Sequence, residues 1–116
     1  MEFCEETVST MMSNFIKKFN KENPLSIKDI DDEIAEVKGS ISNERLWQKG
    51  SNIVEEILMF EQNITDHTEY INRLELLKTK YQDLSKLEKE LEEALGENGK
   101  IMLEIFGDFI KSFDEV

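Results

Sequence analysis

Residues 57–81 read ILMFEQNITDHTEYINRLELLKTKY, and their apolar side chains recur at intervals of three and four residues. Alternating steps of three and four place side chains on one stripe of an α-helix, as in the a and d positions of a coiled coil. We call this stripe the seam, and it predicts a long amphipathic helix that packs against other helices. Its apolar members are Ile57, Phe60, Ile64, Ile71, Leu74 and Tyr81.

The predicted helix that carries the seam spans residues 44–95. Such a helix would be about 78 Å long at a rise of ~1.5 Å per residue, so no other single helix of the chain covers it. Two arrangements remain open. Either the helix pairs with another chain, or it breaks near residues 62–66, where helix formers are poor, and folds back into a compact bundle. We expect the pairing between chains.

Three shorter helices are predicted on either side of the long one, at residues 3–20, 26–39 and 100–113. Pro24 ends the first of them, because proline disfavours a helical conformation in the residue before it. Ser26 is suited to cap the second helix. Gly39 predicts a break within residues 39–43, and Gly96 is well placed for a left-handed cap at the end of the long helix.

The composition agrees with an all-α fold. One Pro and five Gly in 116 residues leave few helix breakers, and 34% of the residues are charged. We therefore expect a single helical domain over residues 1–116, in which one long coiled-coil-type helix is flanked by shorter helices. The assembly is predicted to be a helical bundle or a coiled coil.

The charge balance excludes some classes of partner. The chain has 26 acidic and 14 basic residues, for a net charge of −12. A chain this acidic lacks the basic face with which proteins bind nucleic acid directly. No apolar run is long enough to span a bilayer, and residues 1–20 lack the pattern of a secretory signal. We therefore expect a protein inside a cell, with neither nucleic acid nor membrane as a direct partner.

Residues suited to catalysis or to metal binding are scarce. The chain has one Cys, Cys4, and one His, His67, which stand far apart in the sequence. Zinc and di-iron sites require more His or Cys ligands than this, and no glycine-rich phosphate loop is present. The sequence predicts no enzyme activity, no cofactor and no metal.

Trp47, the only tryptophan, lies near the predicted start of the long helix. We expect it to lie in the core. The alternative is an anchor for a partner, because tryptophan is enriched among the residues that dominate interface energies.

The functional prediction is a scaffold or adaptor subunit that binds a protein partner through the seam, as a homo- or hetero-oligomer. The alternative is a small acidic inhibitor or nucleic-acid mimic that blocks a basic groove of its target. That alternative would use an acidic face made of seven carboxylates, namely Asp29, Asp31, Asp32, Glu33, Glu55, Glu56 and Glu61.

Overall fold

The computed structural model describes residues 1–96 and residue 104, and the described part contains three helices and no strand. The helices are α1 (Glu5–Ile16), α2 (Ile27–Gly50) and α3 (Val54–Leu95). The chain divides into two compact units, Met1–Thr79 and Lys80–Val116. The predicted helix at 100–113 lies outside the described residues except for residue 104. The all-α fold class is confirmed.

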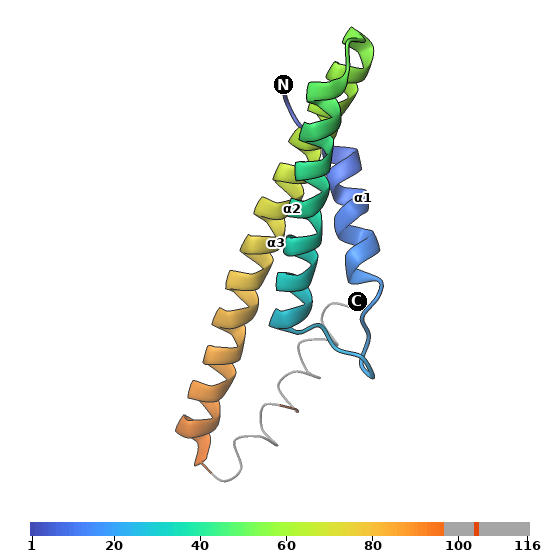
Figure 1. Ribbon diagram of the computed structural model, residues 1–116. Helices are drawn as coiled ribbons and strands as arrows, with labels where there is room; N and C mark the ends of the chain where they lie inside the picture. Colours follow the sequence, from blue (N-terminus) through green and yellow to red (C-terminus); the bar gives the residue numbers. More distant parts are fainter. Residues whose placement is uncertain (97–103, 105–116) are drawn as a thin grey trace. The chain divides into compact units, whose positions relative to one another are not determined.

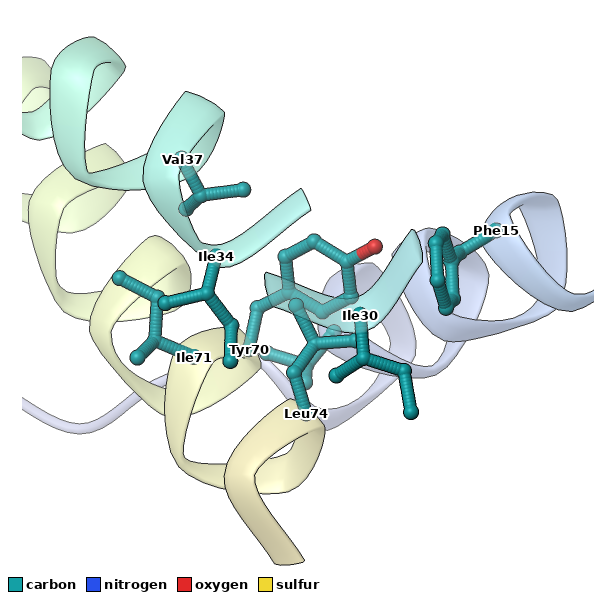
Figure 2. Close-up of a cluster of buried hydrophobic side chains, with 8 residues drawn as sticks. Phe15, Ile30, Ile34, Val37, Tyr70, Ile71 and Leu74 are labelled. Carbon is teal, nitrogen blue, oxygen red and sulfur yellow. The ribbon is translucent and has the colours of Figure 1, made fainter. Parts of the chain in front are cut away.

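In the first unit, α2 and α3 form an antiparallel hairpin, and α1 packs beside it (Figure 1). The core lies where all three helices meet. Val8 of α1, Ile30 of α2 and Leu74 of α3 are fully buried. Figure 2 shows Ile34, Val37, Tyr70 and Ile71 in the same cluster, together with Phe15 of α1.

Helix α1 is shorter than predicted and ends at Ile16 rather than near residue 20. The reason lies in the side chain of Asn20, whose Oδ1 accepts hydrogen bonds from the backbone N–H groups of Glu22 (2.9 Å) and Asn23 (2.8 Å). Asparagine side chains favour turns in this way, by competing with the helical hydrogen-bonding pattern.

Helix α2 begins as the sequence predicts. Ser26 is the N-cap, and its hydroxyl oxygen accepts a hydrogen bond from the backbone N–H of Asp29 (3.2 Å). The Asp29 carboxylate in turn accepts one from the backbone N–H of Ser26 (3.0 Å), which completes a capping box.

The predicted break at residues 39–43 is corrected by the structure, because α2 continues through Gly39 to Gly50. Val37 and Glu44 are buried on either side of this glycine, and Ile41 packs against the core. Their packing holds the helix through a sequence with low helix propensity, since tertiary contacts routinely override propensity. The turn lies at residues 51–53 instead, where Ser51 is extended (φ −93°, ψ 140°).

Helix α3 therefore begins at Val54 rather than near residue 44, and it runs without interruption through residues 62–66. In that stretch the hydroxyls of Thr65 and Thr68 donate hydrogen bonds to carbonyls one turn earlier, at 2.8 and 2.7 Å. The helix ends at Gly96, whose φ of +74° is the predicted left-handed cap. The chain does fold back on itself, but it does so at the turn at residues 51–53 and not at a break at 62–66.

Candidate interaction surface

The end of the hairpin where α2 turns into α3 carries a concentration of exposed apolar side chains. We call residues 46–59 the hairpin tip. Six large apolar side chains in it are between 51% and 67% exposed, namely Leu46, Trp47, Ile53, Val54, Leu58 and Met59. Single exposed apolar residues are ordinary on protein surfaces, but a contiguous group marks an interaction site.

The tip is exposed because α1 covers only the other end of the hairpin. A shallow pocket of about 270 Å³ between α1 and the hairpin is lined by residues of all three helices, Ser40 of α2 and Tyr70 of α3 among them. Trp47 follows Ser40 by about two helical turns, so it stands on the same side of α2 as the surface that faces α1. Helix α1 begins lower down, however, and Figure 1 shows the hairpin extending beyond its start.

The start of α1 is fixed by a buried carboxylate on α3. Asp66 is 3% exposed, and its Oδ1 accepts hydrogen bonds from the backbone N–H of Cys4 (2.7 Å) and from Nε2 of Gln62 (2.9 Å). Arg73 adds an ion pair with Glu5 and lies over the ring of Phe3 at 5.4 Å from its centroid. These contacts place the first turn of α1 beside Asp66, so α1 does not cover the hairpin from Asp66 towards the tip.

Trp47 lies at the surface, so the expectation of a core position is wrong. Its side chain is 58% exposed, and the indole lies beside the ring of Phe60, with ring centroids 6.0 Å apart and ring planes tilted by 44°. Tilted aromatic pairs of this kind hold a ring in place while much of its surface remains accessible. A tryptophan that is both fixed and exposed is the arrangement typical of a binding anchor.

Hydrogen bonds hold the two helices together at the tip. Nε2 of Gln48 on α2 donates to the carbonyl of Ile57 (3.2 Å) and to the carboxylate of Glu61 (2.8 Å), both on α3. Below this pair, Nδ1 of His67 lies 3.2 Å from Oε2 of the buried Glu44. In the turn, the Ser51 hydroxyl donates to Glu56 at 2.8 Å. These hydrogen bonds therefore hold in place the two helices that bear the apolar side chains of the tip.

Around the tip, the exposed charges of α2 and those of α3 have opposite signs. Arg45 and Lys49 near the end of α2 are exposed, and so are Glu55 and Glu56 at the start of α3. Within the described part of the chain, neither of these cations forms a salt bridge. The exposed cations beside the tip thus belong to α2, and the exposed carboxylates belong to α3.

The seam is covered mainly by helices of the same chain. Ile64, Ile71 and Leu74 are at most 8% exposed beneath α1 and α2. Ile57 and Phe60, nearer the tip, are partly exposed, and so is Tyr81, which belongs to the second unit. The buried members of the seam are therefore available to another chain only if the bundle opens.

The seven carboxylates of the predicted acidic face are divided between the two ends of the hairpin. Four belong to the first turns of α2, and three belong to the first turns of α3 near the tip, roughly 30 Å away along α2. Most of them have internal roles. Asp31 pairs with Lys78 at 2.7 Å, and Glu33 accepts the hydroxyl hydrogen of Tyr70 at 3.1 Å. The seven carboxylates therefore form two groups, one at each end of the hairpin.

Cys4 is an exposed free thiol at the start of α1, and hydrogen bonds from Thr7 lower the pKa of that thiol. Among the described residues, no cluster of three or more His, Cys, Asp or Glu side chains is arranged to hold a metal ion.

Sequence reasoning missed two features of this surface. Asp66 was counted only as a poor helix former, because its contact with Cys4 joins residues far apart in the chain. The apolar tip was signalled by Leu46, Leu58 and Met59, which lie off the seam and so have no place in a simple two-helix pairing. Apolar residues outside the packing stripe are the sequence signal that identifies such a surface.

No family model, curated protein or solved structure matches the chain. None of the described helices has a stretch long and apolar enough to cross a membrane.

Proposed function

We propose that this chain is a non-enzymatic helical scaffold or adaptor that acts through helix–helix contacts with a protein partner. The contact surface is the hairpin tip rather than the buried part of the seam. The single observation that carries the proposal is the group of six large apolar side chains, each more than half exposed, at one end of a well-packed bundle.

Two further features support a protein partner for the tip. Trp47 is held against Phe60 and the hairpin is braced by Gln48, so a partner would meet a surface that needs little ordering. The charges beside the apolar side chains include Glu55 and Glu56, which do not provide the basic face that attracts anionic lipid.

The proposal is tested by co-purification with matched variants. Tagged wild-type chain, Leu58→Glu and Leu76→Glu are expressed in the native host, and the polypeptides that co-purify with each are compared. Leu58 lies in the tip and is 52% exposed, whereas Leu76 lies on α3 outside the tip and is 58% exposed. We expect a polypeptide, or a second copy of the chain, that is lost with Leu58→Glu and retained with Leu76→Glu. Equal retention by both variants would contradict the proposal.

A further inference from the structure

We infer that the partner of the hairpin tip is the tip of a second copy of this chain, so that two hairpins associate head to head. This inference rests on the proposed function, because it uses the same surface, and it adds the identity of the partner. Three observations carry it: the apolar side chains of the tip, the separation of charge between its two helices, and the rigidity of the surface.

The charge pattern is complementary to itself. The end of α2 presents Arg45 and Lys49, and the start of α3 presents Glu55 and Glu56, all four exposed. A two-fold axis perpendicular to the plane of the hairpin, passing between two facing tips, brings the basic end of α2 in each chain beside the acidic start of α3 in the other. Each attractive contact is then made twice, as in any two-fold interface. A tip with charges of one sign would repel its copy, whereas charges of both signs allow attractive contacts.

The apolar side chains fit the same arrangement. In a bundle of three or four helices each helix buries its apolar residues against neighbours on two sides, but among the described residues the tip contains only α2 and α3. A second hairpin supplies the two missing helices. Trp47 would lie near the centre of the contact, where tryptophan contributes most to affinity.

The measurement is the mass of the purified chain by sedimentation over a range of concentrations, compared with the 13.6 kDa of one chain. We expect a concentration-dependent dimer. Leu58→Glu places a charge in the contact and should raise the dissociation constant more than about 30-fold, as expected for loss of a dominant interface residue. The control Leu76→Glu should dimerise like the wild type, and circular dichroism should show the same helix content for all three proteins.

A charge exchange tests the geometry itself. The variant Arg45→Glu/Lys49→Glu makes both sides of the tip acidic, and Glu55→Lys/Glu56→Lys makes both sides basic. Each alone should be monomeric at concentrations where the wild type is dimeric, because like charges then face each other. An equimolar mixture should recover the dimer, as a heterodimer with opposite charges at both contacts. High salt should weaken the mixed dimer.

The outcomes separate this inference from the proposed function. A wild-type chain that stays monomeric at high concentration overturns the self-association. If its co-purifying polypeptide is still lost with Leu58→Glu, the proposed function stands with a different partner. A dimer that Leu76→Glu dissociates as well as Leu58→Glu, or a mixture of the charge variants that fails to associate, also overturns the inference. A monomer without any tip-dependent partner overturns both.

Discussion

The two ends of the α2–α3 hairpin are built by the same pair of helices and differ in what covers them. At the end where α1 packs, Ile30 and Leu74 are completely buried. At the tip, Trp47 and Leu58 are more than half exposed, although they belong to the same two helices. The difference follows from the position of α1, which begins beside Asp66 and runs away from the tip.

This comparison shows what a third helix contributes to the burial of apolar side chains. Two paired helices bury the stripe between them and little else, because each presents a cylinder to the other. Where α1 fills the groove, Tyr70 and Val8 are also buried and a core forms. Where no third helix lies, the apolar side chains on that side remain in water. The covered end should therefore determine the stability of the first unit, and the tip should determine its association.

The largest effect is expected at the covered end. Leu74→Ala removes a fully buried side chain from the centre of the three helices and leaves a cavity. We expect the free energy of unfolding to fall by about 3 kcal/mol, within the range for buried leucines. Urea unfolding followed by circular dichroism measures this change. Leu76→Ala, on the exposed side of the same helix, is the matched control and should change the stability by less than about 0.5 kcal/mol.

The next effect concerns the attachment of α1. Asp66→Ala removes the acceptor of the Cys4 N–H at a partly buried site, and Gln62 keeps only its hydrogen bond to the carbonyl of Glu2 (3.1 Å). We expect a loss of about 2 kcal/mol, because an unpaired buried donor costs its full desolvation. Hydrogen exchange should show the amides of α1 losing protection before those of α2.

Asp66→Asn is the control for this prediction, because it keeps an acceptor oxygen of the same shape and should lose less stability. A change in exchange spread evenly over all three helices would show that Asp66 does not act through α1.

Local features of the fold were readable from the sequence. The seam predicted a long amphipathic helix, Ser26 predicted the start of α2, and Gly96 predicted the end of α3, because each depends on residues within one or two turns. The location of the hairpin turn was not predictable in this way. Gly39 and Gly50 have the same local propensity to break a helix, but the packing of Val37 and Glu44 keeps α2 continuous at Gly39.

The candidate surface was harder to predict than the fold. Periodicity shows that the seam is covered but does not show which chain covers it, and residues 64–74 are covered by the chain itself. The exposure of Trp47 depends on where α1 begins, which the contact between Cys4 and Asp66 sets. A contact across so many residues leaves no periodic signal in the sequence.

A smaller effect is expected at Tyr70, which makes the stability of the covered end depend on pH. Burial, together with the nearby Glu33 carboxylate, raises the pKa of Tyr70 well above its ordinary value of about 10. The folded state thus favours the neutral phenol. Its contribution to stability is complete below the pKa of the unfolded chain and declines as the pH rises above about 10, where the unfolded chain ionises first.

Tyr70→Phe isolates this contribution. At neutral pH the variant should lose about 1 kcal/mol with the hydrogen bond to Glu33. Above about pH 10 its stability should fall less steeply than that of the wild type, since no phenol at this site ionises. Urea unfolding at a series of alkaline pH values gives the slope of the free energy of unfolding against pH for the wild type and for the variant. Parallel slopes would show that Tyr70 does not govern the alkaline loss.

The smallest effect on stability is expected at the tip, and it completes the comparison. Trp47→Ala removes an exposed side chain whose main contact is Phe60, so we expect a loss of about 0.5 kcal/mol in a dilute, monomeric sample. The same substitution should weaken association far more than Leu74→Ala does when both are measured under folded conditions. If Trp47→Ala instead destabilised the monomer as much as Leu74→Ala, the tip would belong to the core and the division between the two ends would fail. Unfolding of the monomer and sedimentation of the same preparation, side by side, separate these two results.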